Sequence, residues 1–283
     1  MLPIVALLLS VQLALAEPRL HVSRRAALPR LLGAAAGCRC CGLPFAADAL
    51  TGLTGALDPL AMPRDEKQDA AFANSMANGM QMYEASVASR KAALFPELIA
   101  SLPTQSSPVV VELGVGTFPN AKYWQAARNV DLIGVDPNTS MEPFAREAAD
   151  RSDLAARGIS FRFAPGVGEA LPLADASADA VVCTLTLCSV RSPEATLGEV
   201  LRVLRPGGRF LFLEHILSDN NEALARTQRA LTPLQVATAD NCHLDRPTLE
   251  SIRAAGFASV EAERFELPGF LWLSPTVAGI ATK

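Results

Sequence analysis

The feature that most constrains this chain is a short β-branched strand that ends at an acid and two glycines, in the run 109–117 (VVVELGVGT). Gly114 and Gly116 can adopt backbone angles that other residues avoid, and without a side chain they let a ligand approach the bare backbone. Pro119 follows, and it suits the first turn of a helix, where its missing N–H is not needed. The run therefore predicts a strand, a tight turn and a helix N-terminus, which together form a pocket for a nucleotide-like ligand.

A second acid lies at the end of the next apolar run, residues 131–136 (DLIGVD), and is followed by Pro137. The spacing would put the carboxylate of Asp136 beside a pair of ribose hydroxyls. A dinucleotide site needs a third glycine, but Phe118 and Pro119 occupy the candidate positions, and no Gly-Lys-Ser/Thr follows to make a P-loop. The remaining possibility is an adenosine ligand without a diphosphate, and S-adenosylmethionine (SAM) is the common ligand of this kind. The alternative is a structural turn that binds no ligand.

The segments downstream alternate between strand and helix patterns. Residues 180–187 (AVVCTLTL) form a continuous apolar run, typical of a central parallel strand buried on both faces. Residues 194–204 place apolar side chains at helical spacing, and the RPGG of residues 205–208 then predicts a helix stop and a sharp reversal. Residues 210–215 (FLFLEH) predict another buried strand. The alternation predicts an α/β fold with a mostly parallel sheet.

Several motifs carry a resemblance to a known group of enzymes. In order along the chain, four of them resemble class I SAM-dependent methyltransferases of the type 11 group: 112–116 (ELGVG), 168–172 (GEALP), 179–182 (DAVV) and 204–208 (LRPGG). Other segments are similar to the membrane-associated thiol S-methyltransferases of animals: 82–84 (MYE), 90–95 (RKAALF), 184–190 (TLTLCSV), 212–215 (FLEH) and 240–244 (DNCHL). The resemblance extends over about residues 75–283.

The resemblance implies a Rossmann-like, seven-stranded, mostly parallel sheet with a C-terminal antiparallel hairpin. Residues 258–265 and 276–281 both have strand-like patterns, which fits such a hairpin. Residues 248–255 before them predict a helix that Gly256 closes. We therefore expect a leader at residues 1–49, a helical lead-in at 50–105 and a methyltransferase domain at 106–283.

The resemblance also implies SAM as the cofactor and a set of residues that contact it: Glu112, Gly114, Gly116, Asp136, Pro137, Gly168, Glu169 and Thr184. Two positions depart from the pattern of the group. Phe118 stands where a third glycine is usual, and we expect it to narrow the space beside the amino acid part of SAM. Val167 stands where many type 11 enzymes have an acid, which leaves the adenine amino group to backbone groups or Glu169.

We expect residues near the ends of the later strands to bind the methyl acceptor. His215 follows a buried strand and titrates near working pH, so we expect it to assist deprotonation of the acceptor, with a structural role as the alternative. Cys188, Cys242 and His243 are candidates for substrate contacts, with plain packing as the alternative for Cys188. No Cys/His spacing matches a zinc site, so no metal is predicted.

Two kinds of function follow from these residues. The first is SAM-dependent methylation of a small apolar acceptor, with a thiol favoured and O- or C-methylation of a quinone, phenol or lipid as the alternative. The second is a SAM-fold protein that binds without catalysing. The formal net charge of −4 is not that of a nucleic-acid-binding protein. We expect a small-molecule partner and no nucleic acid, leave peripheral membrane association open, and assign no oligomeric state.

The N-terminus has the pattern of a targeting sequence. Residues 1–16 contain an apolar core and end in ALA, as secretory signal peptides do, and are short for a membrane-spanning helix. Ser23–Leu28 carries twin arginines before an apolar stretch that ends in AADA at residues 46–49. Two signals in tandem resemble the bipartite leaders of algal plastids. We expect a plastid location reached through a secretory signal, with the endoplasmic reticulum, a retained anchor, or one signal plus a linker as alternatives.

Overall fold

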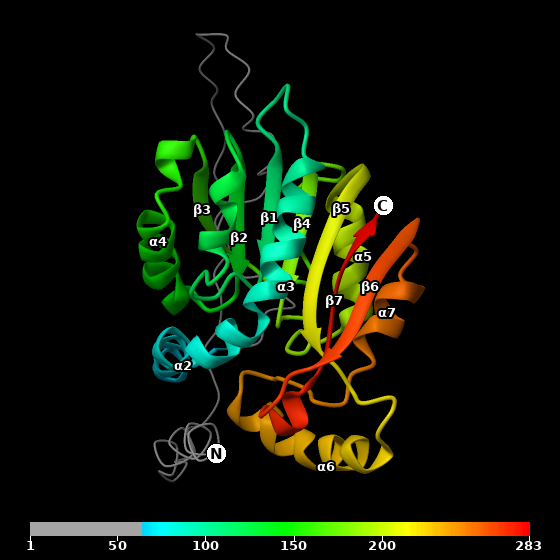
Figure 1. Cartoon of the computed structure of the whole chain (residues 1–283). Coiled ribbons are helices and arrows are strands. Elements are labelled where there is room, and N and C mark those ends of the chain that lie inside the picture. Colours follow the sequence, from blue (N-terminus) through cyan, green and yellow to red (C-terminus); the bar gives the residue numbers. More distant parts are fainter. Residues whose placement is uncertain (1–63) are drawn as a thin grey trace, which may run out of the picture.

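The computed structural model describes residues 64–283, and the expected leader lies outside them. Seven strands form one sheet in the order β3-β2-β1-β4-β5-β7-β6 (Figure 1). Strands β1 to β5 are parallel, and β7 runs antiparallel to both β5 and β6. The predicted seven-stranded sheet with a C-terminal antiparallel hairpin is confirmed. The strands are β1 (Val109–Leu113), β2 (Asp131–Asp136), β3 (Ser160–Pro165), β4 (Ala178–Thr184), β5 (Leu204–His215), β6 (Ser259–Glu266) and β7 (Pro275–Thr282).

Helices precede and connect the strands. Three of them begin at a side chain that accepts a hydrogen bond from a first-turn N–H, which satisfies a donor that the helix itself cannot: Asp65 at α2, Ser192 at α5 and Asn221 at α6. The α-helices are α2 (Glu66–Gly79), α3 (Gln81–Ala100), α4 (Glu142–Arg151), α5 (Pro193–Val203), α6 (Glu222–Thr238) and α7 (Thr248–Ala254). Short 3-10 helices are η2 (Ala121–Ala126), η3 (Thr139–Met141), η4 (Ala155–Arg157) and η5 (Leu271–Leu273).

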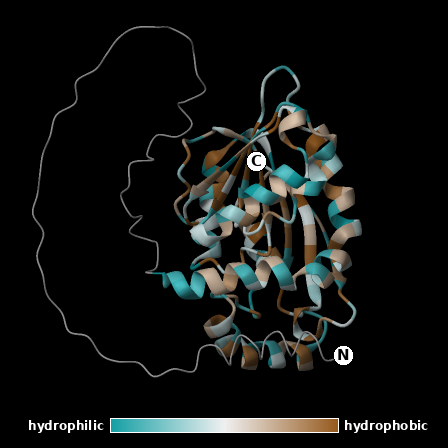
Figure 2. Ribbon diagram, turned by 90° about the vertical axis from the view of Figure 1, so that its left-hand side faces the viewer, coloured by the Kyte–Doolittle hydropathy of each residue, from teal (hydrophilic) through white to brown (hydrophobic). Residues whose placement is uncertain are grey.

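The alternation of side chains along each strand divides the core between the two faces of the sheet. Val111 of β1 belongs to an apolar cluster that includes residues of α5 and α7. Its neighbour Val110 belongs to a second cluster with residues of α3, η2 and α4. The hydrophobic strands thus lie between two helical layers (Figure 2), and the central strands are buried on both faces, as their apolar runs predicted.

Two local predictions differ from the structure. The apolar run 180–187 does not continue as a strand, because β4 ends at Thr184 and Leu185 turns the chain with a φ of +56°. Glu214 holds this turn, since its Oε1 accepts from the N–H groups of Thr186 (2.9 Å) and Leu187 (3.1 Å). The helix stop before the RPGG segment is confirmed, because α5 ends at Val203, but β5 already begins at Leu204. Residues 205–208 form an irregularity inside β5, where the pairing passes from Ala178↔Leu204 to Ala180↔Arg209.

The carboxyl ends of the parallel strands gather at one edge of the sheet, and α2 and α6 lie beneath this edge at the bottom of Figure 1. Arg64 connects the two sides of the edge, because it pairs with Asp69 of α2 (2.8 Å) and with Asp240 after α6 (3.0 Å). Over residues 64–283, no helix combines the length and apolar character needed to cross a bilayer.

Candidate functional site

The loop after β1 has the conformation that its glycines predicted. Gly114 and Gly116 have φ angles of +64° and +52°, and Gly114 N–H donates to Val135 O at 2.8 Å. A Cβ on Gly114 would lie 2.0 Å from Thr186 Oγ1, whereas a Cβ on Gly116 would meet only Gly114 O, at 3.9 Å. Gly114 is therefore required by packing against the turn after β4, and Gly116 keeps an open side that a ligand can approach.

Asp136 ends β2 next to this loop. Its Oδ2 accepts from Gly116 N–H and its Oδ1 from Asn138 N–H, both at 2.9 Å. Burial raises the pKa of this carboxyl to about 6, although the two backbone donors lower it. Asp136 thus fastens the glycine loop to β2 while its carboxylate lies at the edge where open α/β sheets bind ligands. Pro137, half-buried, leads the chain away from the edge.

Glu112 is a buried residue of β1 at the same edge of the sheet. Its Oε1 accepts from Asn120 Nδ2 at 2.7 Å, and its Oε2 has no hydrogen-bond partner among the described residues. Burial raises its pKa to about 7, against the lowering effects of Asn120 and the charge of Lys91. The same Asn120 nitrogen donates to Thr184 Oγ1 at 3.0 Å, so it connects the ends of β1 and β4.

The sequence did not identify two residues near Glu112, Asn120 and Lys91, as part of the site. Asn120 carried one signal, its place directly after the glycine turn and Pro119. Lys91 is buried in α3 and pairs with Glu84 at 2.9 Å. Both residues lie in segments that resemble the thiol S-methyltransferases, 82–84 and 90–95, but nothing in those segments indicated that they face the site.

Three other residues expected near the cofactor make contacts within the protein. Phe118 takes a φ of +58°, as a glycine would, and its ring is buried against Phe161 at a centroid distance of 4.7 Å. Gly168 packs on α5, since a Cβ there would lie 2.8 Å from Thr196 Cγ2. Glu169 accepts from the N–H groups of Arg191 and Ser192 before α5, so its carboxylate already has backbone partners.

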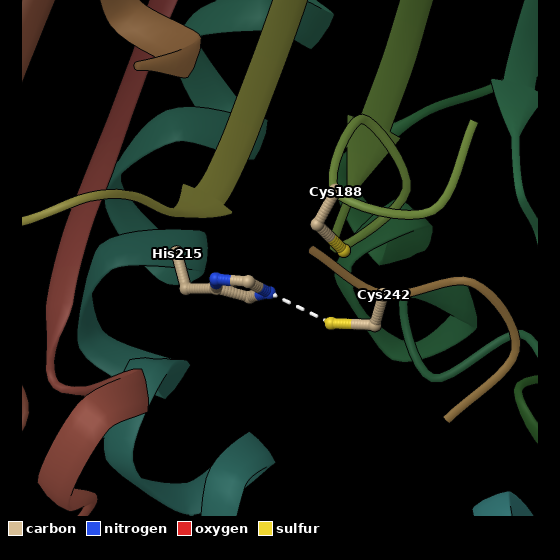
Figure 3. Close-up of side chains that lie close together, drawn as sticks. All are labelled: Cys188, His215 and Cys242. Carbon is tan, nitrogen blue, oxygen red and sulfur yellow. Dashed lines mark hydrogen bonds between the residues drawn. The ribbon is translucent and has the colours of Figure 1, made fainter. Parts of the chain in front are cut away.

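The predicted acceptor residues come together at the ends of β4 and β5. Cys188, His215 and Cys242 are all buried, and their ligand atoms lie within 4.8 Å of one another. Figure 3 shows the three side chains converging, with His215 Nε2 3.2 Å from Cys242 Sγ. We call these three residues the cysteine–histidine cluster. His243 is not part of it, although its N–H donates to Cys188 O at 2.9 Å.

The three groups of the cluster shift one another's pKa values. The interaction with Cys242 and burial raise the pKa of the Cys188 thiol, and the same interaction lowers the pKa of Cys242. Burial alone would lower the pKa of His215, but Cys188 and the adjacent Glu214 raise it. Arg246 lies close enough for its charge to act on His215 and Cys242. Relative to the free side chains, these shifts move Cys242 toward its thiolate form and His215 toward its protonated form.

The residues at the ends of β1, β2 and β4 fit SAM. The site lies between β1 and β4, where the strand order reverses and open α/β sheets bind ligands. SAM is cationic at its sulfonium and ammonium groups, and Glu112 has a buried carboxylate oxygen that accepts no hydrogen bond from residues 64–283. The open side of Gly116 and the nearby carboxylate of Asp136 suit the rest of the ligand. Glu112, Gly116 and Asp136 are the residues that would hold it.

Comparisons with known proteins agree with this geometry. The type 11 methyltransferase domain family matches residues 111–212. Thiol S-methyltransferase TMT1B of Rattus norvegicus is 38% identical over 199 residues, which is 69% of this chain and 79% of the rat protein. Thiol S-methyltransferase TMT1A of Homo sapiens is 34% identical over 206 residues, which is 71% of this chain and 82% of the human protein.

Solved structures share the fold. A chain from the complex between the Haloferax volcanii Trm112 methyltransferase activator and the putative methyltransferase superimposes with a TM-score of 0.56 at 21% identity, covering 78% of this chain and 99% of that chain. The sheet order, the glycine loop with its two acids and the relatives over two thirds of the chain agree. The chain belongs to the family of the TMT1 thiol S-methyltransferases, and it is an enzyme that uses SAM as its cofactor.

Proposed function

We propose that this protein transfers the methyl group of SAM to the sulfur of a small apolar thiol. The observation that carries the proposal is the identity of 34–38% to relatives named thiol S-methyltransferases, over more than two thirds of this chain. A buried cluster of thiol and imidazole groups at the ends of β4 and β5 supports it, because it lies at the same edge as the cofactor residues.

The chemistry requires little of the protein at the methyl carbon. The sulfonium of SAM is already activated, so the protein must mainly hold the acceptor sulfur in line with the methyl group. A thiol must also lose its proton, because the thiolate is the reacting form. His215 is our candidate for assisting that step, and its Nε2 interacts with Cys242 rather than standing alone.

A product-resolved assay tests the proposal. The full chain is incubated with isotopically methyl-labelled SAM and matched acceptors of similar size and hydropathy: an alkyl or aryl thiol, the corresponding phenol, and a quinol. We expect a labelled thioether and little labelled ether. Methylation of the phenol or quinol with none of any thiol would move the assignment to O- or C-methylation.

We further propose that residues 1–49 direct the protein into the secretory route and on to a plastid, and that the mature protein associates peripherally with a membrane. The tandem of an apolar signal and an arginine-rich, acid-poor segment supports the first part. A fluorescent fusion of residues 1–60 in an alga with a complex plastid should accumulate there, with the mature N-terminus near Ala49. Diffuse cytosolic fluorescence would contradict this, and an intact N-terminus at the endoplasmic reticulum would indicate an anchor.

A further inference from the structure

The cysteine–histidine cluster brings together three ligand atoms that metal ions bind, from three separate segments of the chain. Cys188 follows β4, His215 ends β5, and Cys242 follows α6. The two sulfur atoms and a ring nitrogen lie within 4.8 Å of one another, and no side chain of the three is more than 8% exposed. In Figure 3 both sulfur atoms and His215 Nε2 face the same small space.

The donor set and spacing suit a soft or borderline cation. Zinc binds thiolate at about 2.3 Å and imidazole at about 2.0–2.1 Å in tetrahedral geometry. Ligand atoms around one such ion are therefore roughly 3.5–3.8 Å apart. In the structure, His215 Nε2 lies 3.2 Å from Cys242 Sγ, and all three ligand atoms lie within 4.8 Å of one another. Small side-chain movements would bring them to the distances that a bound zinc ion requires. Carboxylate-preferring ions such as Mg²⁺ would not select two sulfur ligands.

Hydrogen bonds hold the segment that carries Cys188 against the segment that carries Cys242. His243 N–H donates to Cys188 O at 2.9 Å, and Asn241 Nδ2 donates to Ser189 O at 2.7 Å. Arg246, on the Cys242 side, donates through Nη2 to Val190 O at 2.6 Å and also to Leu187 O. Segments more than fifty residues apart are thus held in one arrangement, which a preformed ligand site requires.

We propose that Cys188, His215 and Cys242 form a three-ligand site for Zn²⁺, and that the thiol of the methyl acceptor takes the fourth position. The second half rests on the proposed thiol S-methylation. Catalytic zinc sites keep one position open beside three protein ligands, and a Cys₂His set is one of the known forms. Coordination deprotonates a thiol outright. With the ion bound, His215 would therefore assist deprotonation as a ligand of the ion and not as the base.

The atoms and charges balance in this step. The acceptor R–SH binds as R–S⁻ and releases its proton to solvent. Its sulfur then forms a bond to the methyl carbon as the bond from that carbon to the sulfonium breaks, giving R–S–CH₃ and neutral S-adenosylhomocysteine. The thioether is a weaker ligand than the thiolate and leaves. Two cysteine thiolates, Zn²⁺ and neutral His215 have no net charge, so the acceptor thiolate adds one negative charge beside Arg246.

Metal binding is tested first, without activity as the readout. The reduced full chain is stripped with a chelator and titrated with Zn²⁺ against a chromophoric competitor, and bound zinc is counted by mass spectrometry. We expect about one zinc per chain. Because Cys188→Ser and Cys242→Ser each remove a ligand, they should lower the affinity by more than the roughly 10–10²-fold that loss of an outer-shell partner costs. Cys183→Ser is the matched control, because Cys183 is a buried thiol on β4 outside the cluster. His243→Gln is the control for His215→Gln.

Cobalt provides the second readout. Co²⁺ in the site should give the near-ultraviolet charge-transfer absorption of two thiolates, and adding the acceptor thiol without SAM should increase it. A spectrum that the acceptor does not change would overturn the fourth-ligand role. Zinc that binds equally well to the cluster variants, no zinc binding at all, or a Cys188–Cys242 disulfide in place of metal binding would overturn the site. The product assay on thiols decides the proposed function separately, since metal binding is measured without turnover.

Discussion

The cofactor loop and the cysteine–histidine cluster lie at the same edge of the sheet but are built in opposite ways. The cofactor residues Glu112 to Asp136 lie on one stretch that runs from the end of β1 through the glycine loop and η2 to the end of β2. The geometry of the loop is set mostly by backbone: two glycines at positive φ and a carboxylate that accepts Gly116 N–H at 2.9 Å. The cluster consists of side chains from three distant segments. A local site is specified by local sequence, whereas a dispersed one depends on the packing of the whole domain.

The largest expected effect tests whether Gly114 is required for packing against Thr186 rather than for ligand binding. In Gly114→Ala the new Cβ would lie 2.0 Å from Thr186 Oγ1 at a φ of +64°. The sequence alone predicts that a side chain at this position fills space needed by the ligand, whereas in the structure it clashes with Thr186. Left-handed strain and overpacking together predict a loss of about 2–4 kcal/mol in unfolding free energy.

Chemical denaturation with and without SAM measures this effect. Gly198→Ala in α5 is the control, because nothing lies within 4 Å of its Cβ position and alanine favours a helix. Thr186→Ala should partly rescue Gly114→Ala by removing the closest atom. An unchanged stability in Gly114→Ala combined with lost SAM binding would restore the ligand-space explanation.

The second prediction separates the two regions by function. His215→Gln should lower turnover of a neutral thiol at neutral pH by up to about 10²-fold and leave SAM affinity nearly unchanged, because the cofactor residues are on the earlier strands. An acceptor that is already ionised should recover much of the loss; equal losses for ionised and neutral acceptors would mark His215 as structural.

The third prediction addresses the ribose contact. Asp136→Ala should weaken SAM binding by roughly 1.5–3 kcal/mol, the range for hydrogen bonds to a charged group. It also removes the acceptor for Gly116 N–H, so the loop should lose order as well. Asp131→Ala, at the other end of β2, is the matched control for calorimetric titration. Unchanged SAM affinity in Asp136→Ala would remove this residue from the site.

The fourth prediction uses the protonation of the two buried acids. Burial raises the pKa of Glu112 from 4.5 to about 7 and that of Asp136 from 3.8 to about 6. Because cationic SAM favours the ionised carboxylates, its affinity should fall as pH drops through these values, by about tenfold per pH unit for each carboxyl that must ionise.

The stability of the protein without ligand should change in the opposite direction. An acid whose pKa is raised on folding stabilises the folded state below its unfolded pKa and loses this contribution as pH rises through the folded value. The contribution of these two groups should therefore decline between about pH 4 and pH 7. Asp136→Asn should flatten both pH dependences in part, and identical profiles in the wild type and this variant would contradict the assignment.

The smallest expected effect tests the connection between the two regions. Arg64 pairs with Asp69, whose backbone O accepts from Asn138 Nδ2, and with Asp240 near Cys242. Both pairs of Arg64 are part-buried, so Arg64→Gln should cost about 1 kcal/mol of stability, the upper end of the range for surface pairs, and weaken binding of both SAM and acceptor. Arg146→Gln on α4, which breaks a more exposed pair with Glu142, should cost no more than this and leave both binding steps unchanged.

The sequence by itself determined the fold class, the glycine loop and its two acids, because each depends on contiguous residues: β-branched runs, φ > 0 at Gly114 and Gly116, and an acid at a strand end. Only the tertiary structure decided the rest. Thr186, and not a ligand, occupies the free side of Gly114, and Phe118 turns into the core at a glycine-like φ.

The cysteine–histidine cluster shows the same division most clearly. Sequence analysis selected Cys188, His215 and Cys242 one by one, and found no metal-ligand spacing among them. Their ligand atoms meet because parallel strands β4 and β5 end side by side and the loop after α6 folds back over them. Spacing along a chain predicts proximity only within one helix, strand or turn, and these residues are 27 apart at each step.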